Sequence, residues 1–221
     1  MLSVYWGYKS QNACSIFLEM NQDVTSYIPA AASDQVLQLL NDDSLQVLIK
    51  TPRKTRHGDY RKLNNGCHQI TVNSNLNPYR FLVTLLHEIA HFEAYKIYGS
   101  AIKPHGKEWK STFQRLALPF LRPEIFPNQT LPFLAHYFKN PKASSDSDVL
   151  LSRSLKQFDP PNEKTYIFEL VEGAKFKASN GKIFLKGKKR RTRFEATELS
   201  SGRSYAFNPN AEVELIKDSN E

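Results

Sequence analysis

The sequence predicts an α+β fold, in which a domain built around one long helix is followed by a small antiparallel β-module. Three observations support this prediction. A long apolar helical pattern carries two histidines four residues apart, His87 and His91. The segments before it alternate between apolar and polar residues, as half-buried strands do. Beyond a proline-containing linker at residues 159–163, this two-residue period returns and dominates the rest of the chain.

The elements before the long helix are short. Residues 29–40 show the apolar spacing of a short helix. Residues 45–50 and 68–72 alternate as strands, and an asparagine-rich stretch follows the second of them. The expected order is therefore a helix, then strands, then the long helix.

The long helix is bounded by residues typical of helix ends. Asn77 and Pro78 open it as an N-cap followed by proline at the first helical position, and Gly99 closes it. Its apolar residues recur at helical spacing and predict a stripe that faces the core. The stripe comprises Phe81, Leu82, Leu85, Leu86, Ile89, Phe92 and Ile97. The two histidines lie roughly opposite this stripe, away from most of the core.

The histidines and the glutamate between them form the motif H-E-x-x-H, at His87, Glu88 and His91. Two histidines four residues apart lie on one face of a helix, so both imidazoles can reach one metal ion. The glutamate points towards the same site. Chance matches to this motif usually fall in loops or on charged helices, whereas this one lies in a well-bounded apolar helix. The motif therefore predicts a hydrolytic zinc centre.

A third metal ligand is expected shortly after the long helix. His105 follows His91 by fourteen residues, at the entry to a second helix whose apolar face would pack against the first. Glu108 is the alternative, because some H-E-x-x-H enzymes take their third ligand from a glutamate on a following helix. The metzincin spacing H-E-x-x-H-x-x-G-x-x-H is absent, since Ala94 and Ile97 occupy the places of its glycine and last histidine. That family is excluded.

These blocks together resemble the SprT-like zinc metallopeptidases, whose eukaryotic member Spartan cleaves proteins crosslinked to DNA. The resemblance rests on the H-E-x-x-H motif and on the His-Gly-x-Glu-Trp block that begins at His105, and it covers residues 45–120 most strongly. It implies a zincin-like fold, one Zn²⁺ held by His87, His91 and His105, and Glu88 as the catalytic acid/base. It also implies protein substrates, often in a DNA context.

Ligand chemistry predicts the mechanism independently of this resemblance. Three neutral imidazoles leave Zn²⁺ with its double charge and one open position, so a bound water would be acidified from a pKa near 16 towards about 7. Glu88 can take the proton of this water and pass it to the leaving amine. The sequence assigns no oxyanion donor. Candidates that lie near in the chain are His68, Tyr79, Tyr95 and Tyr98.

Composition indicates a globular protein with no membrane partner. The 221 residues are 40% hydrophobic, which is enough for one good core and a small second one. No apolar run reaches about 18 residues, and residues 1–7 lack the pattern of a secretory signal. We therefore expect a cytoplasmic protein, with nucleoid association as a further option. Cys14 and Cys67 are far apart in the sequence, so we expect plain thiols rather than a disulfide framework.

The chain is expected to divide at its clearest linker. We predict a zincin-like domain over residues 1–158, with short helices at 134–138 and 149–157, a linker over 159–163 and a β-module over 164–217. Strand candidates in the module are residues 166–170, 175–177, 182–185, 193–196 and 212–215. Many SprT-like proteins carry a four-cysteine zinc ribbon at this place, but this segment contains no cysteine. It is therefore predicted to be a metal-free, ribbon-like module.

The module also carries the densest positive charge. Residues 175–193 include nine Lys or Arg and no acidic residue, within a chain of formal net charge +8, and residues 50–62 add six basic residues against one aspartate. Basic residues interleaved with phenylalanines suit a phosphate backbone, with non-specific binding that weakens as salt rises. A solvated hairpin is the alternative. The predicted DNA contacts are Lys186, Lys188, Lys189, Arg190, Arg191 and Arg193.

Two functional classes remain open at this point. The first is a zinc endopeptidase that acts on proteins bound or crosslinked to DNA. The second is a nucleic-acid-associated binding or regulatory protein that keeps the zinc domain mainly as a scaffold. Glu88 favours the first class, because a structural metal site needs no general base between its ligands.

Overall fold

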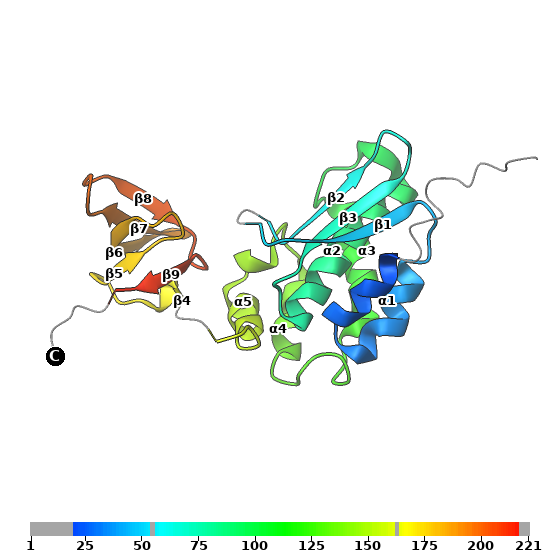
Figure 1. Ribbon diagram of the computed structural model, residues 1–221, viewed down its shortest axis with the longest axis horizontal. Helices are drawn as coiled ribbons and strands as arrows, with labels where there is room; N and C mark the ends of the chain where they lie inside the picture. Colours follow the sequence, from blue (N-terminus) through cyan, green and yellow to red (C-terminus); the bar gives the residue numbers. More distant parts are fainter. Residues whose placement is uncertain (1–19, 54–55, 162–163, 217–221) are drawn as a thin grey trace, which may run out of the picture. The chain divides into compact units, whose positions relative to one another are not determined.

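The computed structural model describes residues 20–53, 56–161 and 164–216, and the described chain is a mixture of helices and strands. It divides into two compact units, one that ends at Pro141 and one that begins at Lys142. Each unit is built on a sheet of its own, with three strands in the first unit and six in the second (Figure 1). The α+β class predicted from the sequence is confirmed at this level.

The first unit combines helices with one small sheet. Its α-helices are α1 (Ser33–Leu39), α2 (Pro78–Tyr98), α3 (Lys107–Ala117) and α4 (Leu131–Lys139). Its strands are β1 (Leu45–Lys50), β2 (Gly58–Lys62) and β3 (His68–Asn73). Its 3-10 helices are η2 (Met20–Tyr27), η3 (Ala30–Ala32), η4 (Gly99–Ala101) and η5 (Leu118–Phe120).

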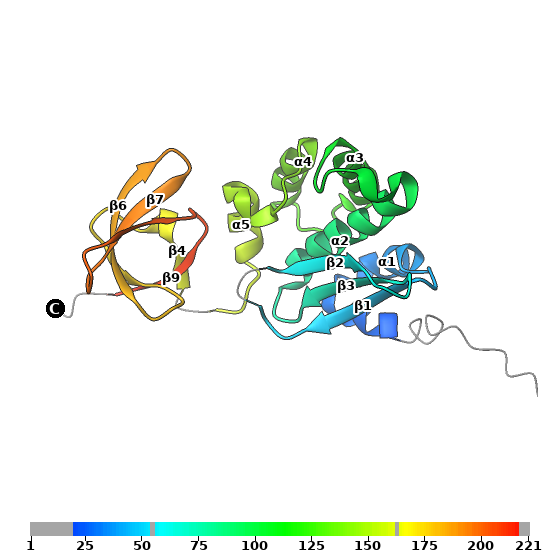
Figure 2. The same ribbon diagram turned by 90° about the horizontal axis from the view of Figure 1, so that it is seen from above.

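The sheet of the first unit has the order β1-β3-β2, so β2 is an edge strand. β1 runs parallel to β3 with Leu45 opposite His68, and β2 runs antiparallel to β3 with Gly58 opposite Val72. Every residue of the central strand β3 is buried. α2 packs on β2 and β3, α3 packs on α2, and α4 packs on α3. Figure 2 shows the strands on one side of α2 and the helices α3 and α4 on the other.

The long helix α2 has the limits that the sequence predicts. The side chain of Asn77 accepts hydrogen bonds from the backbone N–H groups of Tyr79 and Arg80, at 3.1 and 3.0 Å. Gly99 ends the helix with a φ of 74°, a conformation that favours glycine. Most of α2 is buried because it lies between the sheet and α3. Ile97 is the exception in the predicted core stripe: it is 54% exposed, so that part of the prediction is wrong.

The other predictions for the first unit were partly confirmed. The strands over residues 45–50 and 68–72 are present as β1 and β3. The helix expected over residues 29–40 is shorter, because its first turn is the 3-10 helix η3. Strand β2 was not predicted, because only one of its five residues, Tyr60, has the bulky side chain typical of strands.

Cys67 corrects the expectation of two plain thiols. It is buried and disulfide-bonded in the structure. Cys14, the other cysteine of the sequence, lies outside the described residues. In the part of the chain that the structure describes, no helix is long and apolar enough to cross a membrane.

The second unit consists of one helix followed by strands. Its α-helix is α5 (Val149–Lys156), and its 3-10 helices are η6 (Ser145–Ser147) and η7 (Ile167–Glu169). Its strands are β4 (Lys164–Tyr166), β5 (Lys175–Lys177), β6 (Ile183–Arg190), β7 (Arg193–Glu198), β8 (Ser204–Phe207) and β9 (Glu212–Leu215). They form one antiparallel sheet in the order β4-β9-β5-β6-β7-β8.

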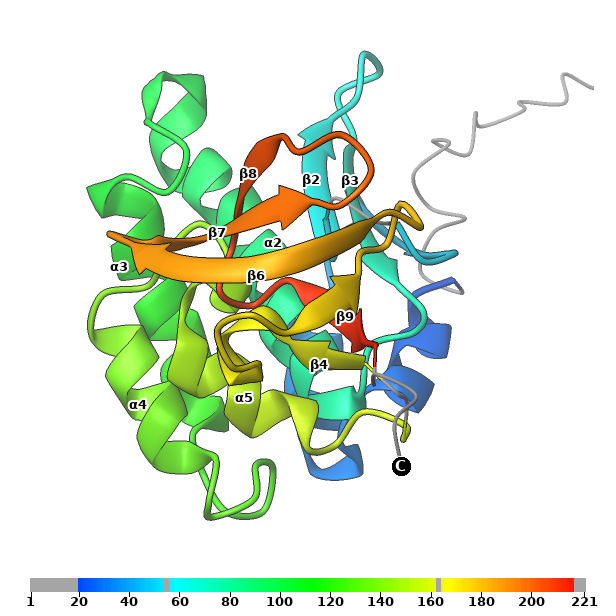
Figure 3. The ribbon, with the colours of Figure 1, turned by 90° about the vertical axis from the view of Figure 1, so that its left-hand side faces the viewer.

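This second sheet encloses a small aromatic core. The rings of Phe176 and Phe184 stack with centroids 5.6 Å apart, and the ring of Phe207 meets both edge-on, at 5.3 and 5.0 Å. Ile167, Ala196 and other small or aliphatic residues complete the core. Figure 3 shows β6 and β7 as the longest strands of this sheet. The core forms without any cysteine in the unit, as the sequence predicts.

Three details of the second unit differ from the predictions. The strand expected over residues 166–170 ends at Tyr166 and continues as η7, and β8 was not predicted. The division between the units also lies before the predicted linker at 159–163. The reason is that α5 packs with the second unit: Ser152 Oγ is 3.1 Å from Tyr166 Oη, and the ammonium of Lys156 lies 3.9 Å from the centre of the Tyr166 ring. The likeness to a zinc ribbon stays a prediction.

Candidate metal centre

His87 and His91 project from the same face of α2, as their spacing predicts. Their Nε2 atoms are 3.3 Å apart. Both side chains are partly exposed, whereas the neighbouring residues Leu86 and Ala90 are buried. The two imidazoles therefore lie at the boundary between the core and the solvent.

His105 reaches the same point from the connection between α2 and α3. A turn, closed by a 2.9 Å hydrogen bond from the N–H of Gly106 to the C=O of Lys103, places it just before α3. His105 has a φ of 59°, in the left-handed region that costs a non-glycine residue roughly 1–2 kcal/mol. Strain of this kind persists only where the surrounding structure fixes it, and it is frequent at functional sites.

The three imidazoles converge through their Nε2 atoms. The distance to Nε2 of His105 is 3.1 Å from His87 and 3.0 Å from His91. Nitrogens bound tetrahedrally to zinc at about 2.0–2.1 Å are about 3.3–3.4 Å apart, so a triangle of this size fits zinc. Among the described residues, these three histidines are the one group placed to hold a metal ion. Glu108, the alternative third ligand, is not part of that group.

Trp109 lies against all three histidines. Its side chain is fully buried, and its ring centroid is 4.6 Å from that of His87, 5.1 Å from that of His91 and 4.6 Å from that of His105. Phe113 packs behind it, 5.0 Å from the indole and 5.4 Å from the His87 ring. Within the described chain the buried indole N–H of Trp109 has no hydrogen-bond acceptor. Trp109 therefore packs on all three imidazoles, and Phe113 packs on that of His87.

Burial keeps the imidazoles in the form that binds metal. It lowers the pKa of His91 to about 3 and lowers the pKa of His87 well below its usual value, and the neighbouring imidazoles add to both effects. Burial also lowers the pKa of His105. All three side chains are therefore neutral at pH 7, as metal coordination requires.

Glu88 lies on the side of α2 that faces β2. Its side chain is buried, and a Cβ placed on Gly58 would lie 2.6 Å from its Oε1 and 2.8 Å from Cγ2 of Thr84. Only glycine allows β2 to approach this closely. Burial raises the pKa of Glu88 to about 8, and the charge of Asp59 adds to the effect. Without a metal ion the carboxyl group is therefore mostly protonated at pH 7.

Tyr60 of β2 also lies at the site, and it was not among the site residues predicted from the sequence. Its ring is stacked on that of His91, with centroids 6.1 Å apart and an interplanar angle of 7°. Its hydroxyl oxygen is 2.8 Å from Nδ1 of His68 on β3. Burial raises the pKa of Tyr60, so its hydroxyl stays protonated. The signal that could have located it is the alternation Gly58, Tyr60, Lys62, which places all three side-chain positions on one face of a strand.

The four oxyanion candidates named from the sequence lie in different places. Tyr79 is near the start of α2, where its ring packs 5.9 Å from that of Phe126. Tyr98 is at the end of α2 and is 46% exposed. Tyr95 lies one helical turn beyond His91 in α2, and its ring is 5.1 Å from that of His68 on β3. His68 and Tyr95 are therefore on the side of α2 that faces β2.

The predicted DNA contacts lie on the hairpin formed by β6 and β7, but one of them is not on its surface. Lys186 is buried; its ammonium donates to the C=O of Leu170 and lies 4.3 Å from the centre of the Phe194 ring. A cation held in this way cannot reach a phosphate, so the prediction for Lys186 is wrong. The exposed members are Lys188, Lys189, Arg190, Arg191 and Arg193.

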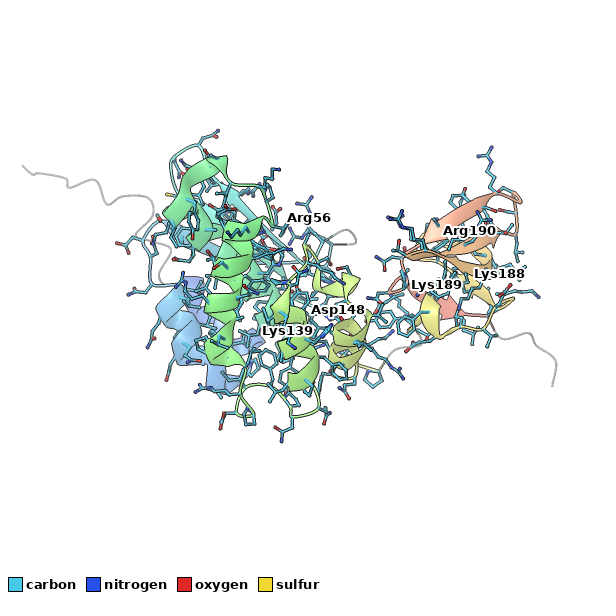
Figure 4. All side chains as sticks on the ribbon, turned by 180° about the vertical axis from the view of Figure 1, so that it is seen from behind. Arg56, Lys139, Asp148, Lys188, Lys189 and Arg190 are labelled. Carbon is cyan, nitrogen blue, oxygen red and sulfur yellow. The ribbon has the colours of Figure 1, made fainter. Side chains whose placement is uncertain are left out.

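The exposed cations of this hairpin make few contacts with the rest of the unit. Arg190 forms an ion pair with Glu195 at 2.9 Å, and the ammonium of Lys189 is 6.0 Å from the centre of the Phe194 ring. Figure 4 labels Lys188, Lys189 and Arg190 on the ribbon of the second unit. We call the five exposed residues Lys188, Lys189, Arg190, Arg191 and Arg193 the basic hairpin.

In the second basic cluster, residues 50–62, the arginines are engaged within the first unit. Arg53 donates to the side chain of Asn73 at 2.8 Å, and Arg61 donates to the side chain of Gln69 at 2.9 Å. Arg56, which Figure 4 labels, forms an ion pair with Asp59. Lys54 lies outside the described residues. These three arginines are therefore engaged by neighbouring side chains of the first unit.

Comparison with known proteins supports the resemblance stated from the motifs. Residues 28–126 match the model of the SprT-like family. The match includes all three strands of the first sheet, α2 with its H-E-x-x-H motif, and α3. No solved structure matches the chain.

Proposed function

From the premise that residues 28–126 are a SprT-like domain, we propose that this chain is a zinc-dependent endopeptidase that acts on proteins. The observation that carries the proposal is the triangle of Nε2 atoms of His87, His91 and His105, with edges of 3.0, 3.1 and 3.3 Å. Glu88 follows His87 in α2, and its side chain is buried against Gly58 of β2. A structural site needs ligands alone, whereas a hydrolytic site needs both the ligands and a group that moves a proton.

The three histidines would hold one Zn²⁺ and leave a position for the reacting groups. When bound, this ion supplies an open coordination site that acidifies a water molecule and polarises a carbonyl. The lowered pKa values of His91 and His105 keep these ligands neutral. The rings of Trp109 and Phe113 hold the imidazoles in place, which reduces the reorganisation needed for binding.

Glu88 would move the proton of the reaction. It takes a proton from the attacking water and returns it to the nitrogen of the leaving amine, so the C–N bond breaks and the carboxyl group ends as it began. Its pKa of about 8 applies to the metal-free protein. The positive charge of a bound Zn²⁺ would lower this pKa and favour the carboxylate that accepts the first proton. Burial against β2 also fixes the position of its carboxyl group.

The outer edge of β2 is the proposed binding place for an extended substrate. The C=O of His57 accepts from the N–H of Asn73, which makes this a hydrogen-bonded pair of the antiparallel ladder. Such pairs alternate with non-hydrogen-bonded pairs, so the next residue along β2 points its N–H and C=O away from β3. The residues that do so are Gly58, Tyr60 and Lys62. Among the described residues no strand pairs with this edge, so a peptide can add to it.

The position of this edge brings a bound peptide past the metal centre. Gly58 lies against Glu88, and Tyr60 is stacked on His91. A peptide strand beside β2 would therefore run along the face of α2 that carries the histidines. An extended conformation is needed for such binding, which favours unfolded segments of protein substrates over compact ones.

We further propose that the basic hairpin binds DNA without sequence preference and brings the peptidase to proteins bound or crosslinked to DNA. The support is the exposure of its five cations, of which one, Arg190, is paired with a carboxylate in the described structure. Each cation that neutralises a phosphate releases a counterion, so this binding would weaken steeply as salt rises.

The test is digestion of a DNA-binding protein by the zinc-loaded full chain and by its Glu88→Gln variant, with and without single-stranded DNA, at low and high salt. We expect the variant to keep zinc and to lose about 10²–10⁴-fold in turnover, the typical contribution of a general acid/base. We expect DNA to increase cleavage by the unsubstituted chain at low salt.

Each result separates the functional classes. Cleavage that needs Glu88 but ignores DNA would support the peptidase and reject the DNA-linked part of the proposal. Zinc bound by His87, His91 and His105 without any Glu88-dependent cleavage would instead favour a binding protein that keeps the metal domain as a scaffold.

A further inference from the structure

We propose that Lys62 and Tyr95 form a subsite for an acidic side chain of the substrate, two residues from the substrate residue that faces the metal centre. The inference rests on the proposed peptidase function and on binding of the peptide along β2. It concerns the substrate class, namely protein segments that carry Asp or Glu close to the cleaved bond.

The first argument is the chemistry of the pair. The ammonium of Lys62 donates to the hydroxyl oxygen of Tyr95 at 2.7 Å and lies 5.1 Å from the centre of the Tyr95 ring. Because Tyr95 accepts in this bond, its own O–H proton is left to donate. Lys62 is exposed at the end of β2, so a carboxylate can approach it. The pair therefore presents two donors, one of them charged, which is what a carboxylate needs.

The second argument is the spacing along α2 and β2, which run side by side. Gly58 lies against Glu88, Tyr60 against His91, and Lys62 against Tyr95. One helical turn from His91 to Tyr95 rises about 6 Å, and two residues of a strand advance about 6.6 Å. In a peptide paired with β2, every second side chain would therefore lie beside one of these three pairs. The substrate side chain two residues along from the one that faces the metal centre would contact Lys62.

The third argument is the charge around Lys62. In the described part of the chain Lys62 forms no ion pair, and its one hydrogen bond is to a neutral hydroxyl. The charges of Lys62 and Asp42 both act on His68. Asp42 is engaged by another cation, because the ammonium of Lys96 lies 2.7 Å from its carboxylate. Lys62 is therefore a positive charge whose partner is not supplied by the described residues.

The opposite face of β2 provides a matched control. Arg61 is also exposed and basic, but its side chain points to the other side of the strand, where it donates to Gln69. The two cations are adjacent in the chain and differ in the face they occupy. A change of charge at Arg61 should therefore leave the preference of a peptide on the α2 side unaltered.

The test is cleavage of a mixture of unstructured peptides by the zinc-loaded full chain, with the cleaved bonds located by mass spectrometry. The chains compared are the unsubstituted protein and its Lys62→Glu, Tyr95→Phe, Arg61→Glu and Glu88→Gln variants. We expect Asp and Glu to be enriched about three- to tenfold at one position within three residues of the cleaved bond, as for a partly exposed charge-assisted bond. Lys62→Glu should replace this enrichment by one for Lys and Arg, and Tyr95→Phe should reduce it.

The outcomes separate this inference from the proposed function. Glu88-dependent cleavage without an acidic preference, or with a preference that Lys62→Glu leaves intact or Arg61→Glu also reverses, would overturn the subsite alone. Absence of any Glu88-dependent cleavage would overturn the peptidase and the subsite with it. The same mixture with amidated C-termini distinguishes a side-chain carboxylate from a chain-terminal one, and loss of the preference on amidation would reject the acidic side chain as the ligand.

Discussion

The metal centre of the first unit and the basic hairpin of the second unit hold their functional side chains in opposite ways. At the metal centre, Nε2 atoms lie within 3.3 Å of one another and the rings pack on the buried Trp109. In the hairpin, Lys188, Arg191 and Arg193 are exposed, and their charge matters more than their exact position. A site made by fixed geometry should fail on one substitution, whereas a site made by charge density should weaken in steps.

The largest effect is expected when one nitrogen is removed from the metal centre. His105→Ala takes away one of three donors, and we expect zinc affinity to fall by more than about 100-fold, since loss of outer partners of a metal ligand already costs 10–100-fold. A competition titration with a zinc chelator measures it. Glu108→Ala should leave the affinity within about threefold of the original. Equal losses in both variants would show that the third ligand is wrongly assigned.

The next largest effect is expected for Trp109, whose buried ring packs on the three histidines. Trp109→Ala removes a fully buried indole, and we expect the first unit to lose about 3–5 kcal/mol of unfolding free energy, as large-to-small core changes do. Chemical denaturation of the metal-free chain measures this change. Leu118→Ala is the control, because Leu118 is 70% exposed and its loss should cost less than about 0.5 kcal/mol.

A smaller effect is expected where β2 approaches Glu88. In Gly58→Ala the new Cβ would lie 2.6 Å from Oε1 of Glu88, so the strand or the carboxyl group must shift. We expect a loss of about 1–3 kcal/mol in stability and a reduced turnover at unchanged zinc affinity. The double variant Gly58→Ala/Glu88→Ala should recover part of the stability, because the shorter side chain makes room. Additive losses in the double variant would show that the close approach is not the cause.

The two regions also differ in how far the sequence could predict them. The sequence could predict that His87 and His91 share one face of α2, because helical periodicity brings residues four apart to the same face. For the third ligand the sequence left two candidates, His105 and Glu108. The connection after Gly99 has no repeating apolar pattern from which the positions of its side chains could be predicted. The structure brings His105 to the pair through the turn at Lys103 and a left-handed backbone.

Tyr60 and Lys186 show why the rest was not predicted. Tyr60 lies in a mainly polar edge strand, where burial on one face is supplied by α2 and leaves little trace in the sequence. Lys186 was assigned to the surface by its charge, although its alternation with Phe184 places both on the inner face of β6. The strand register shifts between Lys186 and Lys189, so the residues beyond it leave that pattern. A prediction based on charge alone therefore placed Lys186 on the surface, although its side chain is buried in the second unit.

The smallest effect per substitution is expected in the basic hairpin. It tests whether this region acts through its charge density and not through fixed geometry. Lys188→Ala should weaken DNA binding by a modest factor, uniformly across sequences, and reduce the slope of log affinity against log salt by about 0.7–0.9, the loss of one phosphate contact. Lys186→Ala should leave that slope unchanged and instead lower the stability of the second unit, because the C=O of Leu170 loses its buried donor. Titration of a fluorescent single strand at several salt concentrations, with thermal unfolding alongside, measures both changes. If Lys186→Ala altered the salt slope and Lys188→Ala did not, the assignment of inner and outer cations would be reversed.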